Sequence, residues 1–360
     1  MASCGHLSRM GTIRGKSNIA AARPLAIHPR SELGRNMAFP INHTFLDTNG
    51  IRMHVAQSGS GDLVILLHGW PELWYSWRHQ MAALSAAGYH VVAPDQRGFG
   101  QSESPEPIEA FNILELTADI IGLVNALGEQ RAVIVGHDWG AQVAAHCGLL
   151  RPDLFHAVAL IAVPFLQRSK RGHPPTQFMK RIARDNQFYQ LYFQEPGRAE
   201  QEFEQDVYLT LRKLLFSGSG DIALDQRPNY FFGKDQGLLD ICVSPNELPQ
   251  WLQEEDLRYF AAEFERSGFR GGLNWYRNID KNWELTHFLI GATITQPALF
   301  IAGERDQTIV LYSNAYETLE NNLPRLYKKI LIPSAGHWVQ QEKPVEVNKV
   351  LLDFLATLNY

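Results

Sequence analysis

Cysteine is scarce in this chain of 360 residues, which holds only Cys4, Cys147 and Cys242. The three are widely spaced, and no CxxC pair or Cys/His cluster has the spacing of a metal site. An odd number of distant cysteines argues against a disulfide framework and favours a reduced, cytoplasmic setting. We therefore expect neither a bound metal nor a fold held together by disulfides.

Long hydrophobic runs and a large net charge are absent as well. No apolar run reaches the roughly 18 residues that a membrane-spanning helix needs. Hydrophobic residues make up 45% of the chain and charged residues 20%, which is the composition of an ordinary globular protein with a large core. A net charge of −5 supplies no positive field for nucleic acid or an anionic membrane. No membrane span and no nucleic-acid partner are therefore expected.

Residues 1–36 lack the apolar stretch of a secretory signal, and their basic residues face a single acid, Glu32. Two interpretations stay open. The segment is either an arginine-rich organelle-targeting peptide or, as we favour, a disordered extension without a catalytic role. Met37 is a candidate natural start, because a clear folding pattern begins just after it. Removal of residues 1–36 should then leave activity and thermal stability nearly unchanged.

From Met37 onward, short β-rich runs alternate with helical periodicity. A hairpin is expected at 43–57, because Asn49-Gly50 is a strong hairpin signal. Further strands are expected at 63–67, 90–93, 132–135, 157–163, 298–302 and 329–332, and helices at 74–87, 111–127, 141–150, 310–323 and 344–358. Strands that are apolar on both faces suit a parallel sheet covered by helices on each side. The pattern therefore predicts an α/β fold with a mostly parallel central sheet.

The alternation stops between about residues 164 and 288. This stretch contains helical pieces, many aromatic residues and loops, but no convincing parallel strand. We interpret it as an inserted, mainly helical cap. The α/β core is then made of residues 37–163 and 289–360.

The strand at 132–135 leads directly into the sequence GHDWG at 136–140 and then into a helix. This is the G-x-S-x-G nucleophile elbow of the α/β-hydrolase fold, with Asp138 in the serine position. The glycines permit a sharp turn that raises the central side chain above the sheet, where amides at the helix start can stabilise negative charge. An aspartate that only caps the helix is the alternative, but the strand, the two glycines and the helix together favour the elbow.

In this fold the acid and the histidine follow the nucleophile in that order. His337 lies in the loop after the last strand, where the base is expected. Asp306 follows the preceding strand and is our candidate for the acid that orients the imidazole. Glu304 in the same loop stays an alternative. His137 and His68 come too early in the chain to be the base, and we interpret both as structural.

The loop HGWPE at 68–72 directly follows a strand and is a candidate part of an oxyanion hole. The backbone amide of Trp70, together with that of Trp139 after the nucleophile, is expected to stabilise negative charge there. The alternative is an ordinary Gly-Pro turn. His68 and Pro71 are also expected to line the substrate pocket.

A carboxylate nucleophile restricts the chemistry. A serine that displaced a group at an sp³ carbon would form an ether, which water cannot readily cleave. Asp138 would form an ester, which water activated by His337 can hydrolyse. This leaves epoxide hydrolysis and dehalogenation. An epoxide oxygen leaves as a basic alkoxide and needs a proton donor such as tyrosine, so the cap is expected to supply tyrosines.

Five stretches carry a resemblance to a known family. They are HGWPELWYSWRHQ at 68–80, DQRGFGQS at 95–102, GHDWGA at 136–141, YQLYFQEPG at 189–197 and FRGGLNWYRN at 269–278. On these motifs the chain resembles the soluble epoxide hydrolase family of α/β-hydrolases across roughly residues 40 to 360.

The resemblance implies a role for each residue that matches these motifs. Asp138 would be the nucleophile, Asp306 and His337 the charge-relay pair, and Tyr189 and Tyr276 the acids that protonate the epoxide oxygen. No metal or other cofactor is implied, and the expected partner is a small-molecule epoxide, bound by a monomer or a homodimer.

Two further residues of the cap motifs stay as candidates. Tyr192 is an alternative to Tyr189, and Trp275, which precedes Tyr276, is expected to line the substrate pocket. A tyrosine in either motif could also be a core aromatic residue with its hydroxyl satisfied.

Two other functions stay open. A haloalkane or haloacid dehalogenase could use the same scaffold, with Trp70 and Trp139 beside a halide. Fluoroacetate dehalogenases would be expected to carry an arginine directly after the nucleophile, where this chain has Trp139. A non-catalytic small-molecule receptor is the third function, and a complete triad argues against it.

Overall fold

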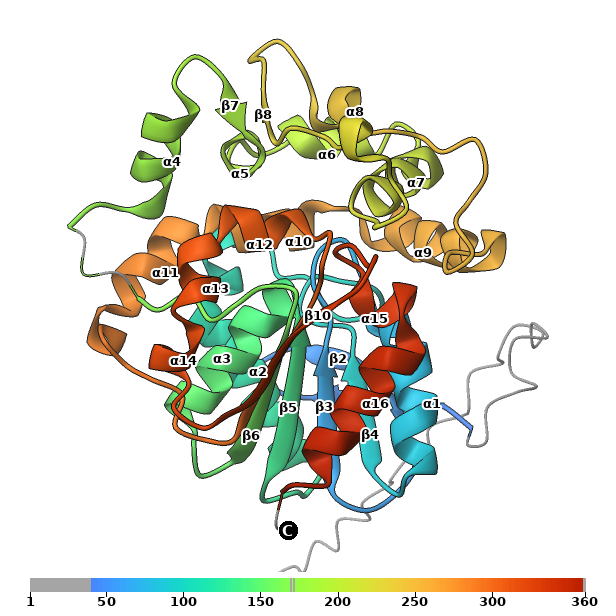
Figure 1. The fold of residues 1–360 in the computed structure, drawn as a ribbon, viewed down its shortest axis with the longest axis vertical. Helices are drawn as coiled ribbons and strands as arrows, with labels where there is room; N and C mark the ends of the chain where they lie inside the picture. The colour runs from blue at the N-terminus through green and yellow to red at the C-terminus, as the bar shows by residue number, and fades with distance from the viewer. Residues whose placement is uncertain (1–39, 169, 171, 359–360) are drawn as a thin grey trace, which may run out of the picture. The chain divides into compact units, whose positions relative to one another are not determined.

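The computed structural model of this chain describes residues 40–168, 170 and 172–358. The predictions made for residues 1–36 and for Cys4 lie outside the described residues. At the centre is an eight-stranded sheet of order β1-β2-β4-β3-β5-β6-β9-β10 (Figure 1). The strands are β1 (Asn42–Asp47), β2 (Arg52–Ser58), β3 (Leu63–Leu67), β4 (His90–Pro94), β5 (Ala132–His137), β6 (Phe155–Ile161), β9 (Ala298–Gly303) and β10 (Leu326–Ile332).

The sheet is mostly parallel, as the sequence predicts. β1 pairs antiparallel with β2, and β2 pairs antiparallel with β4, whereas the neighbouring pairs from β4 to β10 are parallel. The hairpin signal at Asn49-Gly50 is confirmed, since β1 and β2 pair in register from Asn42 to Asp47.

Helices cover both faces of the sheet, which explains why its central strands are apolar throughout. α1 (Arg78–Ala86) and α16 (Pro344–Leu355) pack with Val64 and Leu66 of β3 on one face. α2 (Ile113–Ala126) and α3 (Trp139–Leu150) pack with its alternate residues on the other face. Successive side chains of a strand point to opposite faces, so both sets must be hydrophobic.

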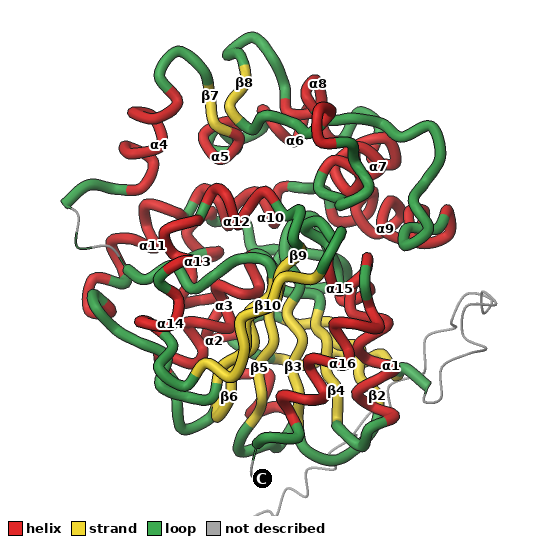
Figure 2. The backbone as a smooth tube through the Cα atoms, viewed as in Figure 1, coloured by secondary structure: helices red, strands yellow, loops and turns green. Residues whose placement is uncertain are grey.

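The cap lies at one end of the sheet and consists mainly of helices and loops (Figures 1 and 2). Its elements are α4 (Pro175–Ala183), β7 (Gln187–Phe188), α5 (Tyr189–Tyr192), α6 (Arg198–Phe203), α7 (Val207–Ser217), β8 (Phe231–Phe232), α8 (Leu238–Ile241) and α9 (Glu254–Ser267). Its two short strands form a small antiparallel sheet of their own.

The chain then returns to the core through two helices. α10 (Arg270–Arg277) packs on η3 (Ile108–Phe111), and α11 (Ile279–Leu285) packs on α2 and α4. The described residues, from 40 to 358, belong to one compact unit, so the boundaries of a separate cap domain at 164 and 288 stay a prediction.

One predicted helix is wrong. The run at 310–323 is divided into α12 (Gln307–Leu311), α13 (Ser313–Glu317) and α14 (Leu319–Asn322). Serine, threonine and asparagine are frequent here, and their side chains compete with the helix for backbone hydrogen bonds. The hydroxyl of Thr318, for example, donates to the carbonyl of Asn314 at one of the breaks (2.7 Å).

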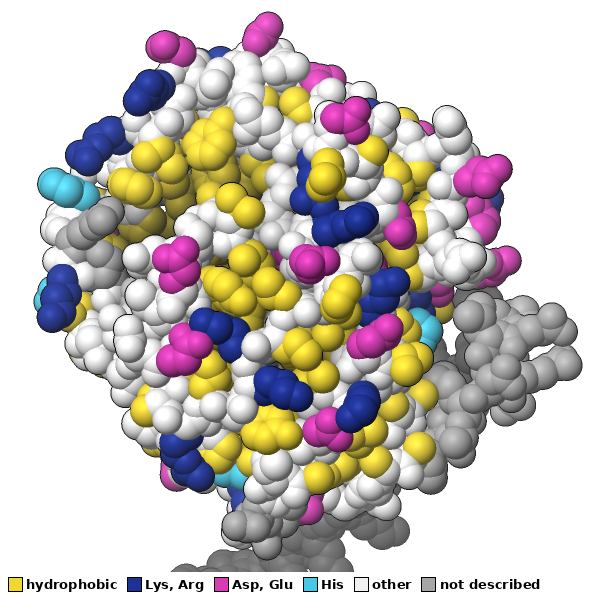
Figure 3. Space-filling model, viewed as in Figure 1, with side chains coloured by type: hydrophobic (Ala, Val, Ile, Leu, Met, Phe, Trp, Pro, Cys, Tyr) yellow, Lys and Arg dark blue, Asp and Glu magenta, His cyan; other side chains and the backbone are white. Residues whose placement is uncertain are grey.

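The described part of the chain contains no helix that is both long and apolar enough to cross a membrane. Within the same residues, no group of three or more His, Cys, Asp or Glu side chains could hold a metal ion. Cys147 and Cys242 are buried and free. On the face drawn in Figure 3, basic and acidic side chains are interspersed.

Candidate active site

Asp138 lies at the turn between β5 and α3, with φ 53° and ψ −118°. Residues other than glycine rarely adopt a positive φ, so this turn is a strained one of the kind that functional sites keep. The two flanking glycines make it possible. A Cβ at Gly136 would collide with the carbonyl oxygen of Gly140, and a Cβ at Gly140 would collide with that of Leu67.

Two backbone amides lie close to the nucleophile position. The N–H of Trp70 donates to Oδ1 of Asp138 (2.9 Å). Gly69 permits this approach, because a Cβ there would overlap the Asp138 side chain. Trp139 is the first residue of α3, so its N–H belongs to the first turn, whose amides have no partner within the helix.

His337 connects two carboxylates. Its Nδ1 lies 3.0 Å from Oδ2 of Asp306, and its Nε2 lies 3.7 Å from Oδ2 of Asp138. Glu304, the alternative acid, is exposed and accepts a hydrogen bond from the Ser334 amide (3.2 Å). Of the two acids proposed from the sequence, the structure brings Asp306 to the imidazole.

The charges of this group reinforce one another. Burial by itself lowers the pKa of His337, but the carboxylates of Asp306 and Asp138 raise that pKa well above its usual value. Burial raises the pKa of Asp306, yet His337 and the Thr308 amide shift it the other way, and the net pKa is lowered. The two neighbouring carboxylates therefore favour the protonated form of the His337 imidazole.

Two tyrosines face Asp138 across a shared space. Tyr189 begins α5 and Tyr276 belongs to α10, and their ring centroids are 6.0 Å apart. Burial, with a contribution from the negative charge of Asp138, raises the pKa of both hydroxyls well above the usual value, so both stay protonated. Tyr192 instead donates to Glu202 (2.8 Å) and lines neither of the cavities described next.

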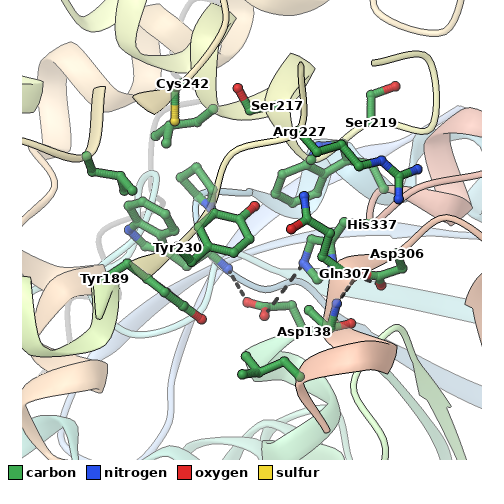
Figure 4. Close-up of a pocket in the computed structure, with 18 of the residues that line it drawn as sticks. Asp138, Tyr189, Ser217, Ser219, Arg227, Tyr230, Cys242, Asp306, Gln307 and His337 are labelled. Atoms are coloured by element: carbon green, nitrogen blue, oxygen red, sulfur yellow. Dashed lines mark hydrogen bonds and ion pairs between the residues drawn. The ribbon is translucent and has the colours of Figure 1, made fainter. Parts of the chain in front are cut away.

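Two cavities meet at Asp138, Tyr189 and Tyr276. The smaller has a volume of about 90 Å³ and the larger about 320 Å³. Figure 4 shows the smaller one, with Asp138 between Tyr189 on one side and His337 and Asp306 on the other. Pro71, a predicted pocket residue, lines this smaller cavity, and so does Trp70, which was predicted for the oxyanion hole. Further lining residues that sequence reasoning missed include Tyr230, Arg227, Thr308 and Gln307.

Two predicted pocket residues line neither cavity, which corrects the sequence prediction. His68 is fully buried, where its Nε2 accepts from the Gln96 amide (3.0 Å) and its Nδ1 donates to the Gly69 carbonyl (2.8 Å). Trp275 is fully buried as well, and its Nε1 donates to the Arg97 carbonyl (3.1 Å). Backbone groups of the neighbouring loops satisfy the polar atoms of both side chains.

Sequence reasoning also missed a buried Glu72–His137 pair next to the nucleophile. Glu72 lies 2.6 Å from Nδ1 of His137, and Nε2 of that ring donates to the carbonyl of His337 (2.8 Å). Burial raises the pKa of Glu72, but His137 lowers it to about 2 overall. The carboxylate also accepts from the Gly69 amide (3.1 Å), so it joins the oxyanion loop, the elbow and the loop of the base. The available signal was a charged residue inside the HGWPE motif.

Comparisons with known proteins agree with this architecture. A family described as the alpha/beta hydrolase fold matches residues 62–344. Epoxide hydrolase A of Mycobacterium tuberculosis is 47% identical over 319 residues, which are 87% of this chain and 97% of that protein.

Solved structures of epoxide hydrolases resemble this chain to a similar degree. An epoxide hydrolase from an endophytic Streptomyces superimposes with a TM-score of 0.85 at 44% identity, covering 88% of this chain and 95% of that one. Epoxide Hydrolase A from Mycobacterium thermoresistibile has a TM-score of 0.84 at 46% identity, with 89% and 99% covered. The nucleophile elbow, the parallel sheet and these similarities lead to one conclusion: the chain belongs to the epoxide hydrolase family of the α/β-hydrolase fold.

Proposed function

We propose that this chain adds water to epoxides and releases vicinal diols, through an ester intermediate on Asp138. The observation that carries this proposal is a carboxylate at the elbow, opposite two buried tyrosine hydroxyls in the same cavities. The carboxylate suits displacement at an sp³ carbon, and the hydroxyls suit a leaving group that needs a proton. Relatives named epoxide hydrolases over nearly the whole chain support the same reaction.

The first step forms the ester. Oδ1 of Asp138 is held by the Trp70 amide, so Oδ2 is the oxygen free to attack an epoxide carbon. The carbon–oxygen bond of the ring breaks, and the departing oxygen takes a proton from Tyr189 or Tyr276, whose tyrosinate then regains a proton from water. Hydrogen bonds to this oxygen strengthen as negative charge develops, so the tyrosines stabilise the transition state more than the bound substrate.

The second step hydrolyses the ester. Esterification removes the negative charge of Asp138, which is one of the causes that raise the pKa of His337. The imidazolium can then release its proton to water, which offsets the proton that the tyrosinate has taken from water. The neutral imidazole serves as a base for the attacking water, while Asp306 keeps it oriented.

The attacking water adds to the ester carbon as His337 takes its proton. Negative charge passes to Oδ1, next to the amides of Trp70 and Trp139. When the intermediate collapses, the imidazolium returns its proton to the departing diol oxygen. The collapse leaves Asp138 as a carboxylic acid, and its proton passes to Nε2 of His337, which restores the carboxylate and the protonated imidazole. No metal or other cofactor enters the reaction.

A matched panel of epoxides and haloalkanes tests this function. Diol formation from epoxides without halide release from haloalkanes is expected, and Asp138→Ala should abolish it while circular dichroism shows an intact fold. Halide release without diol formation would favour a dehalogenase. A loss of less than tenfold in the folded Asp138→Ala protein would exclude the nucleophile assignment.

A cytoplasmic location and a monomeric or homodimeric state belong to this proposal as well. The location rests on the few and distant cysteines of the sequence. Light scattering of the purified full chain measures the oligomeric state, and cell fractionation measures the location.

A further inference from the structure

The larger cavity runs along one face of α3, away from the elbow. Trp139, Gln142, His146 and Leu149 all line it, at the spacing of three and four residues that puts side chains on one side of a helix. His146 lies eight positions after Asp138, which corresponds to about 12 Å along the helix axis. The walls opposite are mainly apolar, with Val163, Phe165, Met179, Ile279 and Leu289 among them.

His146 is a polar group in this apolar space, and its protonation state follows from its contacts. Its Nδ1 lies 2.8 Å from the backbone carbonyl of Gln142, which can only accept a hydrogen bond, so Nδ1 carries the hydrogen. Burial lowers the pKa of the ring, which keeps it neutral. Nε2 therefore presents a bare lone pair, and no side chain or backbone group that the structure describes donates to it.

Gln142, one helical turn closer to the elbow, adds a second hydrogen-bond acceptor to the larger cavity. Its Nε2 uses one of its two hydrogens to donate to the carbonyl of Pro164 (3.2 Å), and its amide oxygen is an acceptor. Two acceptors on successive turns favour a group that donates a hydrogen bond, and they oppose an anion. A donor that enters an apolar cavity is retained only if it finds such an acceptor, because an unpaired polar group is costly to bury.

We propose that the larger cavity selects epoxides with a long apolar arm that ends in a hydrogen-bond donor, a hydroxyl or an amide N–H, which His146 accepts through Nε2. This inference rests on the proposed function and names its substrate class. The smaller cavity, with about 90 Å³ against about 320 Å³, takes the short substituent on the other side of the epoxide ring. The long arm then lies along α3 with its polar end two helical turns from Asp138.

The test uses three epoxides of equal chain length that end in a hydroxyl, a methyl or a carboxylate. The quantity measured is the ratio of kcat/KM between the hydroxyl and methyl substrates, because a ratio cancels any general loss of activity in a variant. One neutral hydrogen bond should favour the hydroxyl substrate in the wild-type protein by about two- to tenfold. The difference should appear in KM, because the distant contact is the same in the ground state and the transition state.

Two substitutions separate the acceptor from the shape of the side chain. His146→Leu keeps an apolar side chain and removes the acceptor, so the ratio should fall to one or below. His146→Gln provides an amide oxygen near the position of Nε2 and should keep part of the preference. His287→Leu, at an exposed histidine that lines neither cavity, should leave the ratio as in the wild type.

Three results would overturn the inference. They are a wild-type ratio of one, a ratio unchanged by His146→Leu, and a preference for the carboxylate substrate, which would point to Arg168 in the same cavity instead. Styrene oxide separates this inference from the proposed function. If the wild-type protein forms diol from styrene oxide while the ratio does not depend on His146, only the inference fails. If no epoxide gives a diol, the proposed function fails with it.

Discussion

Replacement of His337 by glutamine should stop the reaction halfway. A carboxylate attacks an epoxide carbon without help from a base, so the ester on Asp138 should still form. Hydrolysis needs a base for water, and a glutamine amide has no basic nitrogen. In the structure, the imidazole Nε2 lies 3.7 Å from Oδ2 of Asp138, so the base sits at the carboxylate that becomes the ester.

The substitution His337→Gln should slow ester hydrolysis far more than ester formation. A positioned general base contributes about 10²–10⁴-fold, which is about 3–5 kcal/mol of activation free energy, and the variant should lose this amount in ester hydrolysis. Formation of the ester should change by less than roughly tenfold, since the Trp70 amide and both tyrosines are untouched. The alkyl-enzyme should therefore accumulate to nearly one equivalent.

Intact-protein mass spectrometry after incubation with an epoxide measures this accumulation directly. The variant should gain the mass of one substrate molecule, and peptide mapping should assign it to Asp138. His287→Gln, a substitution at an exposed histidine outside both cavities, should show normal turnover and no adduct. A His337→Gln protein that turns over normally without an adduct would refute the reasoning.

Three further predictions concern the tyrosines, the acid Asp306 and the buried Glu72–His137 pair. Tyr189→Phe and Tyr276→Phe should each slow ester formation, and the double variant should form the ester about 10²–10⁴-fold more slowly. Stopped-flow fluorescence of Trp139, whose ring centroid lies 5.2 Å from that of Tyr276, measures the rate of this step. A normal rate in the double variant would show that the tyrosines only line the pocket. Asp306→Asn should slow ester hydrolysis more than ester formation in the same assay, because it removes the group that orients the base, and equal effects on both steps would contradict that role. Glu72→Gln should lower the free energy of unfolding at pH 7 by about 3 kcal/mol, since the folded pKa is about 2 against the ordinary 4.5. This contribution to the free energy of unfolding is fully present above pH 4.5 and is lost as the pH falls toward 2. In urea unfolding, the free energies of the wild type and of Glu72→Gln should therefore converge in acid. Equal free energies at pH 7 would contradict a stabilising role of the Glu72 charge.

The sequence by itself determined the sheet and the elbow, because both follow from local patterns. Strands that are buried on both faces must be apolar throughout. The sharp turn at Asp138 needs glycine at 136 and 140, because a Cβ at either position would collide with a backbone carbonyl oxygen. The order of acid and base along the chain narrowed the acid to two candidates, Asp306 and Glu304. Which of them reaches His337 depends on how two loops from different strands meet, and only the folded chain decided it.

Tertiary structure decided the features that depend on contacts between distant segments. Helical periodicity at 310–323 could not reveal the breaks between α12, α13 and α14, since capping by serine, threonine and asparagine competes with the helix only in a particular backbone geometry. His68 and Trp275 were expected to line the pocket. In the folded chain, Nε2 of His68 accepts from the Gln96 amide and Nε1 of Trp275 donates to the Arg97 carbonyl, both in the loop after β4. His146 lies on an ordinary helix in the sequence, and it becomes a cavity acceptor only because the cap and α11 enclose the space above it.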